Sequence, residues 1–209
     1  MSENFTYIHR YEPGQGANQA VTLLLLHGTG ADENDLRDLG RMLLPGAAQL
    51  RPRGNVLENG MPRFFRRFAE GVLDVEDLKR RAGELADFIR QASTTYGFDE
   101  QQVVAVGFSN GANIAAGMLL LYPQMLRAAV LLHAMIPFEP ETPPDLQGKP
   151  LFLGAGRNDP LVPVQQTERL AEILRSANAN VQVAWQNGGH TVSVEEVRAA
   201  QTWLNQLLV

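Results

Sequence analysis

The sequence predicts an α/β fold with a mostly parallel central sheet and helices on both of its faces. Short apolar runs alternate with helical patterns along the chain, which is typical of this class rather than of a sandwich or a bundle. Four runs are apolar at nearly every position, as strands buried on both faces of a parallel sheet are. They are Val21 to Leu26, Val103 to Val106, Ala128 to Leu132 and Leu151 to Leu153. A fifth, Val181 to Trp185, alternates apolar and polar residues, as a strand nearer the sheet edge does.

Two amphipathic helices are predicted between and after these strands. The first has apolar residues at spacings of 4, 3 and 4 and ends at Gly97 as its C-cap; its apolar residues are Leu78, Ala82, Leu85 and Ile89. The second begins with a capping box formed by Ser193 and Glu196. Its apolar face consists of Val197, Ala200, Leu204 and Leu207. We therefore expect the chain to end in a docked helix.

Length and composition limit the possible functions. The 209 residues are 44% hydrophobic, without repeats or composition shifts, which predicts a single domain over 1–209. With no cysteine, thiolate metal sites and a cysteine nucleophile are excluded. A net charge of −5 without long runs of one sign gives no reason to expect nucleic acid or an acidic membrane as a partner. The N-terminus shows no leader pattern, and no apolar run is long enough to span a bilayer, so we expect a cytoplasmic protein.

Two segments fit neither a strand nor a helix pattern. Arg51 to Leu73 contains two prolines, three glycines and a cluster of Phe and Arg residues. Ala134 to Gly148 contains four prolines among acidic residues. Loops of this length in a compact domain are usually functional or mobile. Both segments are therefore candidate walls of a binding site.

The strongest chemical motif is a G-x-S-x-G sequence centred on Ser109. It lies directly after the Val103 to Val106 strand and before a helical pattern over 112–121. A serine on such a strand-to-helix turn is held in a strained conformation with its hydroxyl above the sheet, and the flanking glycines remove side chains that would collide there. A simple glycine-rich turn is the alternative. The placement favours a nucleophile.

A serine nucleophile needs an imidazole base and a carboxylate that orients this base. His190 follows the Val181 strand in a glycine-rich turn, and Asp159 follows the Leu151 strand, where ligand groups collect in such sheets. The alternatives are a surface-loop histidine and an ordinary Asp-Pro turn. His133, at the end of another predicted strand, is interpreted as a residue packed near the site.

The developing oxyanion needs N–H donors, usually one after the nucleophile and one after an early strand. The backbone N–H groups of Asn110 and Thr29 occupy these positions. Asp32 and Asp35, which follow Thr29, are interpreted as a helix cap.

Candidate pocket residues come from two places. Met61, Phe64 and Phe65 are predicted to form an apolar wall, with Leu161 and Val162 on the opposite side. The neighbouring arginines, which are Arg63, Arg66 and Arg67, could bind a substrate carboxylate. A solvated basic turn, or ion pairs with nearby acids, is the favoured interpretation.

Four blocks of sequence in this order resemble the α/β-hydrolase superfamily, and within it the phospholipase/carboxylesterase family that includes acyl-protein thioesterases. They are LLHGTGADENDL, GFSNGANIA, GRNDPLVP and GGHTVSVEE. RPRGNVLENGMPRFFRR is similar to a bacterial carboxylesterase branch. The resemblance implies an esterase without cofactor or metal, often a homodimer, with Ser109 as nucleophile, His190 as base and Asp159 as its orienter.

The resemblance also bears on the substrate. Family members that act on long acyl groups commonly have glutamine after the serine, whereas Asn110 stands here, which favours small or short-chain esters. The alternatives are an acyl-protein thioesterase or lysophospholipase, and a non-catalytic ligand-binding module. With 209 residues there is no room for a separate cap domain.

Overall fold

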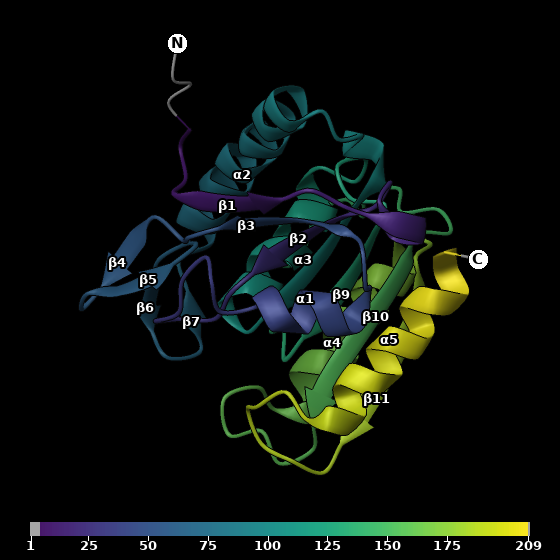
Figure 1. Cartoon of the computed structure of the whole chain (residues 1–209). Coiled ribbons are helices and arrows are strands. Elements are labelled where there is room, and N and C mark those ends of the chain that lie inside the picture. Colours follow the sequence, from purple (N-terminus) through teal and green to yellow (C-terminus); the bar gives the residue numbers. More distant parts are fainter. Residues whose placement is uncertain (1–4, 209) are drawn as a thin grey trace.

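A seven-stranded sheet forms the centre of the computed structural model, which describes residues 5–208 (Figure 1). Residues 1–4 and Val209 belong to the predicted domain over 1–209 but lie outside the described residues. The strand order is β1-β3-β2-β8-β9-β10-β11. These strands are β1 (His9–Glu12), β2 (Thr22–Leu26), β3 (Ala48–Pro52), β8 (Val103–Phe108), β9 (Ala128–Leu132), β10 (Pro150–Gly156) and β11 (Asn180–Gln186). Only β1 pairs antiparallel within this sheet.

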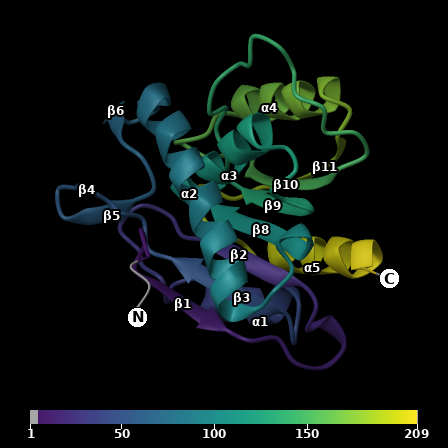
Figure 2. The same cartoon turned by 90° about the horizontal axis from the view of Figure 1, so that it is seen from above.

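Helices cover both faces of the sheet. The helices are α1 (Arg37–Leu43), α2 (Val75–Tyr96), α3 (Asn110–Leu121), α4 (Val164–Ser176) and α5 (Val194–Leu208), with 3₁₀ turns at Gly16–Asn18 and Glu100–Gln102. Figure 2 shows α2, α3 and α4 on one side of the strands and α1 and α5 on the other. Alternate strand residues point to the two layers: Leu24 packs in the core beneath α2 and α3, and Leu23 in the core beneath α1 and α5. The predicted α/β fold is confirmed.

The predicted helix ends are confirmed at α2 and α5. Gly97 follows α2 in a left-handed conformation, with φ 74°. At α5, the Glu196 N–H donates to Ser193 Oγ at 3.1 Å, and the Ser193 N–H donates to Glu196 Oε2 at 3.3 Å. The interpretation of Asp32 and Asp35 as a cap is wrong, because α1 begins only at Arg37 and Asp32 Oδ1 instead accepts the N–H of Asn34 in a local turn.

Two strands of the central sheet, β1 and β3, were not predicted, and β3 shows why. It contains Arg51 and Pro52, residues that indicate a loop when read along the sequence. Arg51 is nevertheless buried in the sheet, because its Nη1 donates to Gln49 Oε1 at 2.8 Å and lies 3.5 Å from a carboxylate oxygen of Glu12 on β1. Ion pairing between strands thus allows a charged residue inside this element.

The first unassigned segment folds into two small hairpins beside the sheet. One pairs β4 (Val56–Glu58) with β5 (Met61–Arg63), and the other pairs β6 (Arg67–Ala69) with β7 (Val72–Leu73). The second unassigned segment, 134–148, has no helix or strand. Among the described helices, none has the length and hydropathy needed to cross a membrane.

Candidate active site

The site lies where the chain reverses its direction of travel across the sheet. From β2 the chain moves first to β3 on one side and later to β8 on the other, and such switch points leave a crevice at the carboxyl ends of the strands. Thr29 follows β2, Ser109 follows β8, His133 follows β9 and Asp159 follows β10. Parallel strands bring these residues to one edge of the sheet.

Ser109 occupies the turn between β8 and α3 with an unusual backbone conformation. Its φ is 52° and its ψ −115°, and its N–H donates to Leu132 O at 2.9 Å. A non-glycine residue at positive φ is strained, which is typical of functional sites. The turn is closed tightly: a Cβ placed on Gly111 would lie 1.9 Å from Leu26 O. The predicted reason for glycine beside the serine is therefore confirmed.

Ser109, His190 and Asp159 form a continuous hydrogen-bonded chain. His190 Nε2 lies 2.8 Å from Ser109 Oγ, and His190 Nδ1 lies 2.7 Å from Asp159 Oδ2. The other Asp159 oxygen accepts the N–H groups of Leu161 and Val162 at 2.8 and 3.0 Å. Burial opposes ionisation of Asp159, but these hydrogen bonds and those of the imidazoles hold its pKa below the usual value. The carboxylate therefore stays charged and faces the imidazole.

The loop that carries His190 is fastened to the loop that carries Asp159. Asn158 Nδ2 donates to Asn187 O at 2.7 Å, and the Asn158 N–H donates to Gly188 O at 3.1 Å. Gln186 Nε2 donates to Thr191 O at 2.9 Å across the same turn. A turn rich in glycine is thereby held in one conformation, and the imidazole has a fixed place beside the serine.

The side chains of the two predicted oxyanion donors contact the end of β5 and the residue that follows it. Arg63 Nη1 donates to Thr29 Oγ1 at 2.5 Å, and the Phe64 N–H donates to Asn110 Oδ1 at 2.7 Å. Within the described part of the chain, the backbone N–H groups of Thr29 and Asn110 have no acceptor. Both donors remain available to a ligand.

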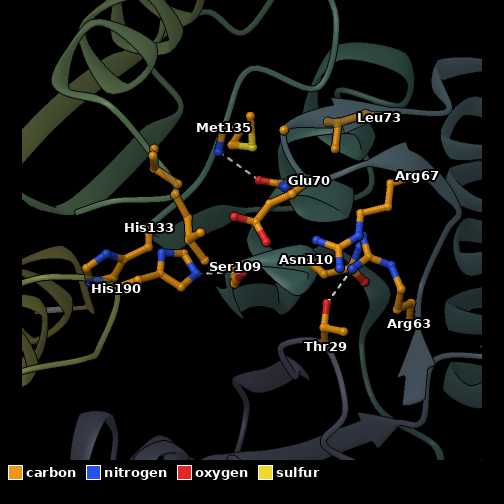
Figure 3. A pocket seen from close by; sticks show the side chains of 14 residues that line it. Thr29, Arg63, Arg67, Glu70, Leu73, Ser109, Asn110, His133, Met135 and His190 are labelled. Carbon is orange, nitrogen blue, oxygen red and sulfur yellow. Dashed lines mark hydrogen bonds between the residues drawn. The ribbon is translucent and has the colours of Figure 1, made fainter. Parts of the chain in front are cut away.

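A narrow cavity of about 40 Å³ opens at Ser109. Figure 3 shows Ser109 and His190 at one side of it and Arg63 and Arg67 at the other, with the Glu70 side chain extending between them. Both unassigned segments contribute to its wall, through Glu70 and Met135 among others. The prediction that these segments border a pocket is confirmed.

The predicted apolar wall is partly wrong. Leu161 and Val162 line the cavity, but Phe64 and Phe65 do not, because both rings are completely buried in the core under α2 and α3. Met61 lies outside the cavity as well, on the exposed hairpin and close to Gly30. In place of these residues, the cavity is lined by residues that the sequence did not single out, which are Glu70, Gly71, Leu73, Asn113 and Met135.

The arginines pair with acids of their own surroundings, as the favoured interpretation predicts. Arg63, which is buried, lies 3.1 Å from Glu58 Oε2, and Arg67 contacts the same carboxylate at 2.9 Å. Arg66 points away from the cavity to Asp74, at 2.9 Å. The two guanidinium groups at the cavity thus share one carboxylate.

His133 and Glu196 form a second polar cluster next to His190 and Asp159. His133 Nδ1 lies 2.7 Å from Asp159 Oδ2, the same oxygen that contacts His190. His133 Nε2 lies 3.3 Å from Glu196 Oε2. The sequence indicated that His133 packs near the site, but assigned Glu196 only to the helix cap. His133 follows β9, Asp159 follows β10 and Glu196 lies on α5, so no regular spacing in the sequence indicates that they are neighbours.

Within residues 5–208, the only group of side chains that lies close enough together to hold a metal ion is His133, Asp159 and His190. One atom from each of His133, Asp159 and His190 lies within 4.8 Å of the others. Each of these atoms already has a hydrogen-bond partner within the cluster. The three side chains form a hydrogen-bonded network.

A wider apolar groove of about 490 Å³ borders the other side of His190. It lies between α1 and the start of α5. Its apolar lining consists of Leu36, Leu39, Met42, Phe108, Val192, Val194 and Val197. Ser109 is not among its lining residues.

Comparisons with known proteins show a family and similar structures for this chain. The model of the family described as Phospholipase/Carboxylesterase matches residues 12–208. The Bacillus subtilis (strain 168) protein named "Putative hydrolase MhqD" is 48% identical over 201 residues, which span 96% of this chain and 99% of that protein. The crystal structure of a Bacillus cereus carboxylesterase superposes with a TM-score of 0.94 at 45% identity, covering 97% of this chain and 95% of the other. The structure of YahD with malic acid superposes with a TM-score of 0.90 at 29% identity, covering 96% and 99%.

Proposed function

We propose that this chain, which belongs to the phospholipase/carboxylesterase family and is a hydrolase of the carboxylesterase type, cleaves small or short-chain carboxylic esters through an acyl-enzyme on Ser109. The observation that carries the proposal is the position of His190. Its two ring nitrogens lie 2.8 Å from Ser109 Oγ and 2.7 Å from Asp159 Oδ2. This is the arrangement in which an imidazole accepts the serine proton while a carboxylate stabilises the resulting cation.

The first half of the reaction forms the acyl-enzyme. Ser109 Oγ attacks the ester carbonyl carbon while His190 Nε2 accepts the hydroxyl proton. The carbonyl oxygen becomes an oxyanion and accepts hydrogen bonds from the N–H groups of Thr29 and Asn110. When the intermediate collapses, the C–O bond of the ester breaks, and His190 gives its proton to the departing alcohol.

The second half repeats these steps with water. His190 removes a proton from a water molecule, which attacks the acyl carbon, and the same two N–H groups bind the new oxyanion. Collapse breaks the bond to Ser109 Oγ, to which His190 returns the proton. The carboxylic acid leaves, and the enzyme is restored. Asp159 orients the imidazole throughout.

Labelling of Ser109 by a fluorophosphonate is the direct test. We expect one phosphonyl group per folded chain, located by peptide mass spectrometry at Ser109, because only an activated serine attacks this phosphorus centre. The control is heat-unfolded protein, which should not react. A folded chain that stays unlabelled, or is labelled elsewhere, would contradict the proposal and would favour a non-catalytic ligand-binding module.

The apolar groove beside His190 favours a second candidate, an acyl-protein thioesterase or lysophospholipase with long acyl groups. Its volume of about 490 Å³ would hold a long chain, whereas the cavity at Ser109 measures about 40 Å³ and is bordered by Arg63, Arg67 and Glu70. Because only the small cavity reaches Ser109, short acyl groups are the first choice.

A series of p-nitrophenyl esters from acetate to palmitate separates the two candidates. We expect kcat/KM to be highest for acetate or butyrate and to fall at least tenfold by octanoate. One methylene changes binding in an apolar pocket by about 1–3 kcal/mol. Forcing extra methylenes into a cavity that is too small for them costs about 1–3 kcal/mol as well. A maximum at long chains, or faster cleavage of matched thioesters, would support the second candidate instead.

We further propose a homodimer and a cytoplasmic location. The homodimer rests on the family, and sedimentation of the purified chain would test it. The lack of cysteine fits a reducing compartment.

A further inference from the structure

The Asp159 carboxylate serves two histidines at once. Both His190 Nδ1 and His133 Nδ1 lie 2.7 Å from Asp159 Oδ2. The two imidazole rings are 5.2 Å apart at an interplanar angle of 75°. In the reaction proposed above, Asp159 needs only one imidazole to orient. The mechanism therefore leaves His133 without a role.

The burial and backbone conformation of His133 hold its ring beside this oxygen. Its side chain is fully buried, and its backbone has a φ of 55°, a left-handed conformation that costs energy for a residue with a side chain. The His133 N–H donates to Gly154 O at 2.8 Å, which fixes the turn after β9. A strained backbone that directs a buried polar ring toward a triad carboxylate is typical of a functional position.

Glu196 approaches the far nitrogen of His133 from α5. Its Oε2 lies 3.3 Å from His133 Nε2 and also accepts the Ser193 N–H. A Cβ on Gly154 would lie 2.1 Å from Glu196 Oε1, so this approach requires glycine on β10. Glu196 is almost completely buried, and within the described residues its Oε1 has no hydrogen-bond partner. Such a carboxylate needs a cation nearby.

Both ring nitrogens of His133 thus face carboxylate oxygens. A neutral imidazole carries one N–H and would direct a lone pair at one of these oxygens, whereas an imidazolium donates to both. Burial alone lowers the pKa of His133, but the hydrogen bonds to Glu196 and Asp159 outweigh it and raise the pKa above the ordinary histidine value. The groups that face the ring are Asp159, Glu196, His190, the Gln186 amide at 3.5 Å and the edge of Phe108.

We propose that His133 and Glu196 are positioning residues of the active site, with Glu196 holding His133 as an imidazolium that shares the Asp159 carboxylate with His190. The inference rests on the proposed function. Because the His133 cation lies beside the catalytic ring and contacts the same carboxylate oxygen, a further positive charge is unfavourable at this site. The cluster therefore extends activity toward low pH.

The test is the pH dependence of kcat/KM for p-nitrophenyl acetate in the Glu196→Gln variant. Glutamine keeps the capping box and the shape of the side chain, but it removes the charge that holds the proton on His133. We expect the midpoint of the acid limb to move to higher pH. Activity at the plateau should change much less than activity at pH 5.5, which is a split that simple loss of structure would not give.

Glu195→Gln is the matched control. It removes the same charge from the neighbouring, exposed residue in the first turn of α5, and its acid limb should coincide with that of the wild type. His133→Asn is the second variant, because asparagine tolerates the left-handed backbone and can still donate to Asp159. It should shift the acid limb in the same direction as Glu196→Gln.

The charge on His133 can also be measured directly in the wild-type protein. Imidazole ¹⁵N shifts, assigned with the His133→Asn spectrum, should show an imidazolium at pH 7; a neutral ring would overturn the proposal even if a variant does not fold. Identical acid limbs for Glu196→Gln and Glu195→Gln would overturn it as well. If the wild type itself hydrolyses no ester and Ser109 takes no fluorophosphonate, then the proposed function has failed, which is a distinct outcome.

Discussion

Replacement of Ser109 by alanine is expected to lower kcat for p-nitrophenyl acetate by about 10⁶-fold, close to the loss of all triad chemistry. Without Oγ no acyl-enzyme forms, and the hydrogen bond at 2.8 Å from His190 disappears. The N–H groups of Thr29 and Asn110 stay in place, so a small residual rate above water is expected from oxyanion stabilisation alone. Steady-state kinetics together with circular dichroism of the variant measures both activity and fold. A rate within tenfold of the wild type would contradict the assignment of Ser109.

Ser109→Gly is the matched partner of this variant. It is expected to be equally inactive but more stable than Ser109→Ala, because glycine adopts the observed φ of 52° and ψ of −115° without steric cost. Such strain costs about 1–3 kcal/mol, and the extra chain entropy of glycine offsets about 0.5–1 kcal/mol of it. Thermal unfolding of the two variants should therefore differ by several degrees. Equal stability would show that the serine turn stores little strain.

Gly111→Ala is expected to have the largest effect on stability. A Cβ at this position would lie 1.9 Å from Leu26 O and 2.7 Å from His27 O, and both atoms belong to the backbone at the end of β2. The helix α3 must then move away from the sheet, which we expect to cost at least about 3 kcal/mol of the free energy of unfolding. The same movement displaces Ser109, so activity should fall with stability. Urea unfolding monitored by fluorescence measures the first effect.

Gly83→Ala provides the control for this substitution. It adds the same methyl group to a helix, α2, but the atom it meets first is the Tyr122 hydroxyl at 2.8 Å, which belongs to a side chain. Relief of glycine entropy contributes about 0.5–1 kcal/mol in the helix interior, so the net change should stay within about 1 kcal/mol. Equal losses of stability in the two variants would indicate that the close approach of α3 to β2 is not what destabilises Gly111→Ala.

Local patterns were sufficient to predict five of the seven strands of the central sheet and the ends of two helices. The buried strands, the helix ending at Gly97 and the capping box at Ser193 were all predicted, because each depends on residues near in sequence or on simple apolar periodicity. Strand β3 was not predicted, because Arg51 becomes compatible with burial only when Gln49 and Glu12 lie beside it. Glu12 becomes a neighbour of Arg51 because β1 pairs with β3 in the sheet, not because the two residues are close in sequence.

The sequence by itself determined which residues carry the proposed chemistry: a glycine-flanked serine after a strand, an aspartate after another and a histidine in a flexible turn. It could not determine the walls of the site. Phe64 and Phe65 look like pocket residues in the sequence but fill the core, while Glu70 reaches the cavity from a hairpin. Only the tertiary structure joined Glu196 on α5 to His133 and Asp159, because residues on separate elements become neighbours through packing across the sheet.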